Sequence, residues 1–368
     1  MTFLNIHILQ TIPFSNLNRD DSGSPKSVIY GGTNRARLSS QALKRAARTN
    51  FEAASSADMT HRTKYASDHL LGLVSKIFLD LNVQPTEAML AEIKQLSLSE
   101  IRKLTAKEKT DAKNNEPGDT LVWLAESETF ELANKIVNSV RASEDQLGMD
   151  GWIQSATSSL TIACFGRMFA AAPNVQTEAA IQVAHAFTTH ATSTEIDYFT
   201  AVDDWRERYE GDKGAGHLDL AEFTSGVFYR YFNIDRAQLA ENWSDIQSLD
   251  ASDRLIALFK SLVLSLPSGK TNVTAPNTLP MLIVVEESSW PVSFADAFEG
   301  AIPESDKGFA SASRDRFLDY QSRARATMSS LFGTTMVMDL TADGSASLDD
   351  LATFSANWIL DAVTEEAR

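Results

Sequence analysis

A run of basic side chains between Asn16 and Arg48 is the part of this 368-residue sequence best suited to chemistry. It holds seven Lys or Arg residues and two Asp residues, a local net charge of +5, whereas the whole chain carries −16. Proteins that bind bulk nucleic acid are often basic throughout. A short cationic segment on an acidic chain instead indicates a confined site for one anion or one polyanionic strand.

The elements that must position these charges follow from the local pattern. Ser39 and Ser40 supply an N-cap, and the good helix formers after them predict a helix to about Ala54. Its N-terminus would offer free N–H groups and a partial positive charge to a phosphate. One polar face of that helix gathers Gln41, Lys44, Arg45 and Arg48, and Arg35 and Arg37 alternate as on one face of a short strand. A solvated helix face beside a basic loop is the alternative that this pattern leaves open.

Patterns for metal, nucleotide and nucleophile chemistry are weak. The six histidines form no His-Glu-x-x-His motif and have no cysteine partners for zinc. Residues 268–271 (Ser-Gly-Lys-Thr) match the end of a P-loop, but Leu264 stands where the motif needs glycine, and Lys270 remains only a basic loop residue. Cys164 lies in an apolar run, where a thiol is normally inert.

Two carboxylate pairs, Asp20-Asp21 and Asp203-Asp204, could in principle hold Mg²⁺. Neither pair comes with further acidic ligands at a recognisable spacing, so ion pairing to nearby arginines or capping of a strand end is the favoured interpretation.

The rest of the chain predicts an α+β protein. We expect a first strand over residues 1–14, a long polar loop to Ser40, helical patterns from Thr60 to Val140, and a buried strand over Leu160–Met168. An amphipathic helix over Ala179–His190 would then carry His185 and His190 as structural residues. Residues 195–204 and 223–231 predict a β-hairpin around a glycine-rich turn. A strand over 279–285 and helices near 236–239, 252–264, 313–328 and 348–363 complete the chain.

Six motifs resemble one protein family. They are Leu-Asn-Arg-Asp-Asp at 17–21, Gly-Gly at 31–32, Arg-x-Arg at 35–37, Ser-Ser-Gln-x-Leu-Lys-Arg at 39–45, Phe-Gly-Arg-Met at 165–168 and the Phe-Thr-Ala-Val-Asp-Asp string ending at 204. Together they resemble the CasC-type backbone subunit of the type I-E CRISPR Cascade complex, from the first strand to at least residue 234.

The resemblance implies a hand-shaped α+β protein with an RRM-like, ferredoxin-type palm. Its expected parts are a palm strand, basic loop and helix at 1–58, helical fingers at 59–155, more palm at 156–190, a thumb hairpin at 191–232 and the palm completion with C-terminal helices at 233–368. It also implies no catalytic activity, no cofactor and no metal. The expected partners are CRISPR RNA, target DNA through the guide, neighbouring copies of the chain and other Cascade subunits.

Site residues are carried over on the matched motifs. Phosphates would be neutralised by Arg19, Lys26, Arg37, Lys44, Arg45 and Arg48, and the RNA backbone would be hydrogen-bonded by Ser39 and Gln41. A displaced nucleotide would be framed by Arg167, Met168, Phe199, Thr200 and Val202. From pattern alone, Arg167 could equally be an ordinary surface charge, Met168 could be core, and one of Tyr198 and Phe199 could face the interior.

Composition sets broader expectations. The single cysteine fits a reducing compartment, the apolar runs are too short to span a bilayer, and the N-terminus lacks signal-peptide features, so we expect a cytoplasmic protein with no membrane partner. Two other functions remain open, a single-stranded RNA-binding module unconnected to CRISPR and a metal-dependent nuclease.

Overall fold

The computed structural model describes residues 1–55, 58–105, 121–142, 151–202, 208 and 215–366. The chain divides into two compact units. Unit 1 comprises Met1–Arg48, Val183–Ile234 and Leu258–Ser355, and unit 2 comprises Thr49–Gln182, Asp235–Ala257 and Ala356–Arg368. The predicted thumb at 191–232 lies wholly in unit 1, whereas the predicted fingers at 59–155 lie wholly in unit 2.

A nine-stranded sheet organises unit 1. Its strand order is β11-β10-β1-β9-β7-β3-β2, and β6 (Ile181–Val183) and β8 also pair with β9. The strands are β1 (Phe3–Ser15), β2 (Ser27–Tyr30), β3 (Thr33–Leu38), β7 (Ala186–Thr188), β8 (Glu195–Val202), β9 (Ala215–Asp235), β10 (Leu282–Ser288) and β11 (Phe332–Asp339). Strand β1 is central and buried without interruption from Leu4 to Gln10, so the predicted first strand is confirmed.

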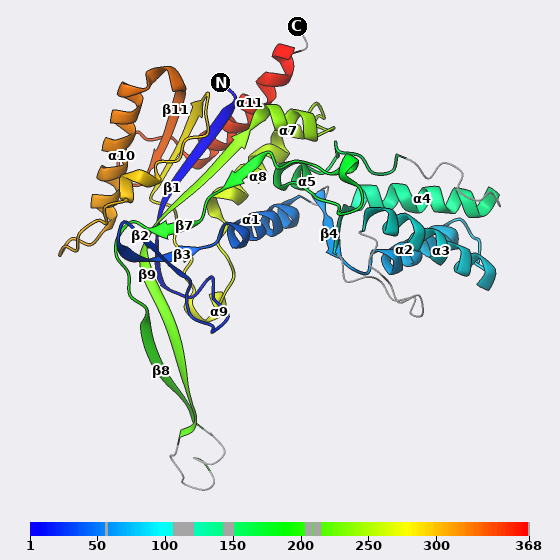
Figure 1. Ribbon diagram of the computed structural model, residues 1–368, viewed down its shortest axis with the longest axis horizontal. Helices are drawn as coiled ribbons and strands as arrows, with labels where there is room; N and C mark the ends of the chain where they lie inside the picture. Colours follow the sequence, from blue (N-terminus) through cyan, green and yellow to red (C-terminus); the bar gives the residue numbers. More distant parts are fainter. Residues whose placement is uncertain (56–57, 106–120, 143–150, 203–207, 209–214, 367–368) are drawn as a thin grey trace. The chain divides into compact units, whose positions relative to one another are not determined.

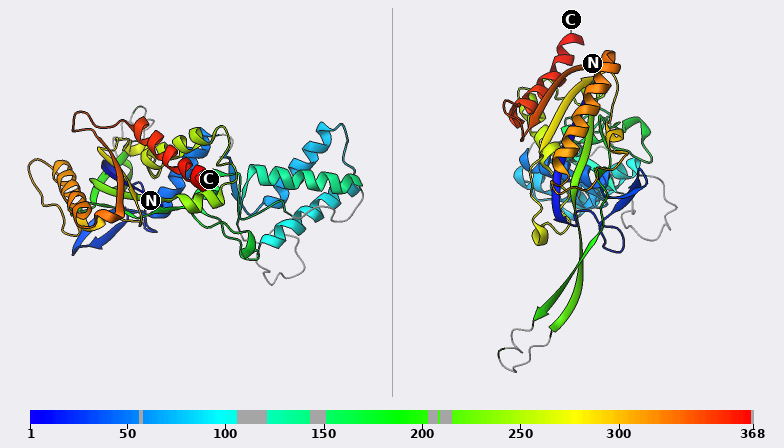
Figure 2. Two further views of the ribbon diagram at one scale, coloured as in Figure 1. Left: turned by 90° about the horizontal axis from the view of Figure 1, so that it is seen from above. Right: turned by 90° about the vertical axis from the view of Figure 1, so that its left-hand side faces the viewer.

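Two α-helices and two 3-10 helices accompany this sheet in the described residues. They are α9 (Thr271–Thr274), η3 (Ala295–Phe298), α10 (Ala310–Thr327) and η4 (Ser329–Leu331). Helix α10 lies alongside β10 and β11 in both views (Figures 1 and 2), and its Phe317 joins Leu9, Tyr229 and Phe294 in one core cluster. A second cluster contains Ile12, Leu38 and Phe228 together with Leu43 of α1 (Ser40–Ala54). Pairs of apolar clusters of this kind fix which face of each strand is buried.

Three helices form the core of unit 2. They are α2 (Ala66–Asp80), α3 (Glu87–Leu104) and α4 (Glu126–Ala142), and their apolar faces meet at Leu70, Phe78, Ile93, Leu132 and Ile136. The predicted helical block is therefore present, although it also contains a two-stranded sheet, β4 (Thr60–Thr63) and β5 (Val122–Ala125). Shorter elements of this unit are α5 (Leu160–Phe165), η2 (Pro173–Val175) and α7 (Arg236–Asn242). Helices α8 (Ala251–Leu264) and α11 (Leu348–Glu366) begin in one unit and end in the other.

Two predicted elements are wrong in type. The apolar run at Leu160 forms a short helix, because the Ser159 side chain caps Ile162 N–H, Asp58 Oδ1 accepts from Leu160 N–H, and Gly166 ends the helix at a φ of 75°. A six-residue apolar run does not distinguish a strand from a helix. Conversely, residues 179–190 form β6 and β7 rather than an amphipathic helix, since Phe187 pairs with Tyr229 in the sheet. The loop expected up to Ser40 also contains the β2–β3 hairpin.

The buried imidazole of His7, on β1, should make the stability of the native chain depend on pH. It stacks on Phe294 with ring centroids 4.6 Å apart and shares a 2.9 Å hydrogen bond from Nδ1 to the Tyr229 hydroxyl. Complete burial lowers the pKa of His7 from 6.5 to about 3. Between pH 6.5 and 3, His7 is therefore protonated in the unfolded chain but neutral in the native chain. The free energy of unfolding consequently falls as the pH drops toward 3.

We expect His7→Phe to flatten this dependence, because phenylalanine keeps the stacking and has no proton to gain. Each pH unit across this window is worth about 1.4 kcal/mol. Because the unfolded imidazole is already half protonated at pH 6.5, the free energy of unfolding of the wild type should fall by about 2 kcal/mol more than that of the variant between pH 6.5 and 4.5. The exposed His69 offers a control, since His69→Phe should leave the wild-type slope in place. Equal slopes for the wild type and His7→Phe would contradict the assignment.

Candidate nucleic-acid interface

Asn18 connects the basic loop of unit 1 to the start of α1. Its carbonyl accepts from Lys26 N–H at 2.9 Å, and its side-chain Oδ1 accepts from Ser39 N–H at 2.8 Å. The Lys26 carbonyl in turn accepts from Arg37 N–H at 2.8 Å. These bonds bring Lys26 next to Arg37 and hold both at the N-terminal end of the helix.

A cationic cluster forms around His185, which comes from the segment between β6 and β7. Arg37 lies 3.4 Å from its Nδ1, and the same atom accepts from Ser40 N–H at 2.9 Å. The pKa of His185 is lowered by burial and by the positive charges of Arg37 and Lys26. The imidazole is therefore neutral at pH 7, and the two cations lie close enough to act on one group.

Unpaired positive charge is the electrostatic signature of this cluster. Within the part of the chain that the structure describes, no carboxylate forms an ion pair with Arg19, Lys26, Arg37 or Lys44. Lys44 is half-buried, and burial lowers its pKa. An external anion would relieve both the repulsion between Lys26 and Arg37 and the partial desolvation of Lys44.

The remaining predicted residues of this segment divide into two groups. Gln41 and Arg45 are exposed on α1 and Arg48 is half-buried, so the predicted polar helix face is present. Ser39 is buried instead, and its Oγ accepts from Ala42 N–H, so it caps the helix and is not placed to bond an RNA backbone. Arg35 is also internal, since its guanidinium donates to the carbonyls of Thr188 and Phe298.

Asp20 caps a turn in the basic loop. Its Oδ1 accepts from the N–H groups of Ser22 and Ser24 and from the Ser22 hydroxyl, whose bond is the main cause that lowers the pKa of Asp20. No group of three or more His, Cys, Asp or Glu side chains suited to a metal occurs among the described residues. Asp203 and Asp204 lie outside them.

The predicted hairpin is present as β8 and β9, and it projects from the sheet of unit 1 (Figure 1). Its two faces differ, because residues two apart share a face. One face exposes Ile196, Tyr198 and Leu220, with Tyr198 opposite Leu220. The other carries Phe199 among the carboxylates of Glu195, Asp197 and Asp219, and Phe199 is 46% exposed. A ring surrounded by carboxylates suits an uncharged base better than a phosphate.

Thr200 and Val202 belong to β8 by their backbones, opposite Leu218 and Ala215. Their side chains lie outside the described residues. The role expected for them therefore stays a prediction.

Comparison with known proteins shows which family this chain belongs to. A family model described as CT1975-like protein matches residues 4–365. The chain is a CT1975-like protein. A separate search of curated proteins gave no match. Two solved structures resemble this CT1975-like protein over nearly its whole length. One, a chain of a "CRISPR RNA-guided surveillance complex, pre-nicking", has 29% identity and a TM-score of 0.79, and the match covers 97% of this chain and 100% of that one.

The second structure is a chain of a "CRISPR RNA-guided surveillance complex" with 25% identity and a TM-score of 0.68. The match covers 98% of this chain and 100% of that chain. Together with the family match, these similarities identify a Cas7-type protein with a mixed α/β fold that combines an antiparallel sheet with helices.

Arg167 of the CT1975-like protein is not at the surface, although both the predicted contact to a displaced nucleotide and the alternative of an ordinary surface charge require it there. Its side chain is fully buried in unit 2, with a 2.6 Å ion pair to Glu128 and a 3.1 Å hydrogen bond to the Gln154 carbonyl. An Arg that is enclosed in this way cannot reach a phosphate, so we leave it out of the interface. The adjacent Met168 is 80% exposed and remains available for contact.

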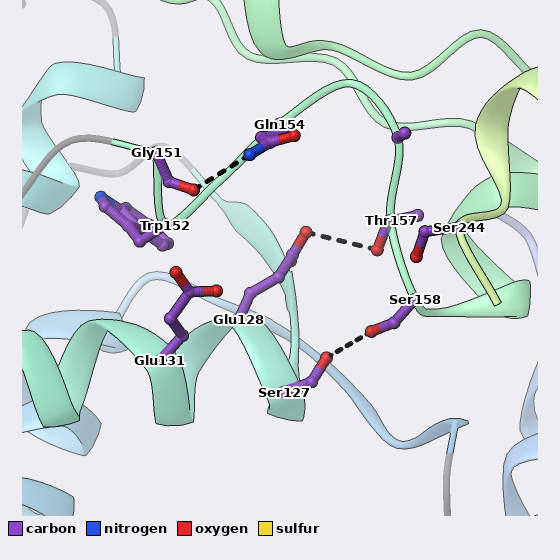
Figure 3. Close-up of a pocket in the computed structure, with 10 residues that line it drawn as sticks. Ser127, Glu128, Glu131, Gly151, Trp152, Gln154, Thr157, Ser158 and Ser244 are labelled. Carbon is purple, nitrogen blue, oxygen red and sulfur yellow. Dashed lines mark hydrogen bonds between the residues drawn. The ribbon is translucent and has the colours of Figure 1, made fainter.

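A pocket of about 240 Å³ lies beside this ion pair in unit 2 (Figure 3). Its lining includes Glu128, Glu131, Trp152 and Thr157, and Thr157 Oγ1 donates to Glu128 Oε1 at 3.4 Å. None of the predicted RNA-binding residues lines it.

Among the described residues, the helices are all too short or too polar to span a bilayer.

Sequence reasoning missed His185 as a member of the cationic cluster. It is 148 residues from Arg37 in the chain and reaches it because β3 pairs with β7, with Arg37 opposite Phe187 and Leu38 opposite Ala186. No local spacing in the sequence carries that signal.

Proposed function

We propose that this CT1975-like protein is a CRISPR RNA-binding backbone subunit of a type I-E Cascade surveillance complex. Several copies polymerise along the spacer of one guide RNA and hold it for pairing with target DNA in antiviral defence. The protein contacts phosphates and sugars, while base pairing supplies the sequence specificity. The subunit catalyses nothing, needs no cofactor and works in the cytoplasm beside other Cascade subunits.

The family match over residues 4–365 is the observation that carries this proposal, because it spans the basic segment, the hairpin and the sheet together. The full-length similarity to chains of CRISPR RNA-guided surveillance complexes supports the same function. The geometry is consistent with it, since Lys26, Arg37 and Lys44 present cations without internal ion pairs in the described structure. The assignment to type I-E is supported by the sequence motifs. We also propose that the sheet of unit 1 is the RRM-like palm.

On this proposal, phosphates bind Arg19, Lys26, Arg37, Lys44, Arg45 and Arg48, with Gln41 at the helix start. Phe199, Thr200, Val202 and Met168 frame a displaced nucleotide. The carboxylates on the Phe199 face of the hairpin then keep phosphates away and admit a base.

Co-purification tests this function. The chain is expressed with the genes that neighbour its own and with a CRISPR array, the purified particle is weighed by native mass spectrometry, and its RNA is sequenced. A large particle with several copies of the chain on one uniform guide RNA is expected. Single copies on mixed RNA would favour a general single-strand binding module, Mg²⁺-dependent cutting of the bound strand would favour a nuclease, and an RNA-free monomer would overturn both RNA-binding proposals.

A further inference from the structure

The end of β1 concentrates backbone strain. Phe14 has a φ of 43°, a left-handed conformation that a bulky residue rarely adopts. Lys270 and Ala275, at the two ends of α9, also have left-handed conformations, with φ values of 48° and 43°. The α9 segment lies against this end of β1, since a Cβ on Gly269 would stand 2.4 Å from the Leu17 carbonyl oxygen. Strain of this kind persists only where the surroundings impose it, and it gathers at functional sites.

Hydrogen bonds to β9 hold Phe14 in this conformation. Its N–H donates to Ser225 Oγ at 2.9 Å. The next residue, Ser15, exchanges side-chain bonds with Thr224, whose Oγ1 donates to the Ser15 carbonyl while Ser15 Oγ donates to the Thr224 carbonyl. The β8–β9 pairing reaches Phe223, the residue just before Thr224. Phe14 is therefore fixed at the root of the projecting hairpin (Figure 1).

Phe14 gains little burial from this arrangement, since 65% of the residue is exposed. A glycine or an asparagine would adopt the same φ with less strain. The fold thus holds an aromatic ring at a strained position and presents it to solvent. An aromatic side chain has few rotatable bonds, so on a backbone that is already fixed it loses little conformational entropy when a planar partner stacks on it.

We propose that Phe14 is a stacking platform for one base of the bound RNA strand, an inference that rests on the proposed function. It lies in the same unit as the basic segment and the hairpin, five residues before Arg19 and at the root of the strands that carry Phe199. Asp219, opposite Phe199, is six residues from Ser225 along β9, roughly 20 Å at the rise of a strand. The two rings therefore serve different bases.

The test uses the assembled complex and guide RNAs that carry 2-aminopurine at successive positions. Phe14→Ala should weaken guide binding about 10-fold, since stacking on one base typically gives 5-fold to 100-fold in affinity. The fluorescence of 2-aminopurine should rise at one position per copy of the chain. Phe14→Trp should retain affinity, and Trp290→Ala, which removes an equally exposed aromatic from the same unit, should change neither readout.

Phe14→Gly separates stacking from folding. Glycine relieves the strain at a φ of 43°, so its thermal midpoint should equal or exceed that of the wild type while its affinity falls as in Phe14→Ala. Unchanged affinity and fluorescence in both variants would overturn the proposal, as would an intact RNA contact with fewer copies per particle, which would make Phe14 a protein contact. Failure of the proposed function looks different, because the wild-type chain itself would then bind no guide RNA.

Discussion

Replacing Lys26, Arg37 and Lys44 together with glutamate should weaken binding of the guide RNA at least about 100-fold near physiological salt. Each substitution removes a cation that would release a counterion and adds a charge that repels phosphate. For single strands, the slope of log affinity against log salt should fall by about 0.7 for each cation lost, hence by about 2 for the triple variant. Affinity measured at four or five salt concentrations gives both quantities.

The fold should tolerate this triple change. None of the three side chains forms an ion pair in the described structure, so their replacement leaves no carboxylate of the fold without its cation. The matched control replaces three exposed cations of α2 and α3 (Lys76, Lys94 and Arg102) with glutamate. It therefore changes the net charge by the same amount. A similar loss in both triples would indicate a general charge effect. An unchanged salt slope would indicate that the three cations do not contact phosphate and that the basic segment is only a solvated helix face.

Local pattern was enough to predict the elements that carry their own signals. The cap at Ser39 and Ser40, the apolar spacing of α1 and the alternation of β8 and β9 are all short-range features, and the structure contains those elements. The positive charge of the segment could also be predicted from the sequence. The sequence does not show whether a particular cation forms an ion pair or a buried hydrogen bond, because its partner lies elsewhere in the chain.

Arg35 and Arg37 illustrate that limit. They are two residues apart on β3, yet Arg35 is buried with its guanidinium on two backbone carbonyls, while Arg37 is half-exposed beside His185. The acceptors for Arg35 are the carbonyls of Thr188 and Phe298, which only the folded sheet brings near. Burial of polar groups therefore follows from tertiary pairing, which spacing in the sequence does not encode.

Arg167 offers the sharpest separation of a structural role from an RNA contact. Its ion pair with Glu128 joins the first turn of α4 to the segment around Gln154, and Glu128 Oε2 also accepts from Ala125 N–H at 2.9 Å. Removal of one member of a buried ion pair leaves the other charge without compensation. Arg167→Met should therefore lower the free energy of unfolding by about 3–5 kcal/mol.

A double-mutant cycle with Glu128→Gln should recover part of that loss, because the double variant leaves no buried charge unpaired. Arg102→Met, which removes an exposed guanidinium of the same unit, should cost less than about 0.5 kcal/mol. Urea unfolding gives these energies, and guide-RNA affinity measured on the folded fraction should stay within about 2-fold of the wild type, since a buried guanidinium makes no phosphate contact. The opposite result, native stability with a 10-fold or greater loss of RNA affinity, would show that Arg167 leaves Glu128 to bind RNA. The Phe-Gly-Arg-Met motif would then belong to the interface after all, and the buried ion pair would be only the RNA-free arrangement of that side chain.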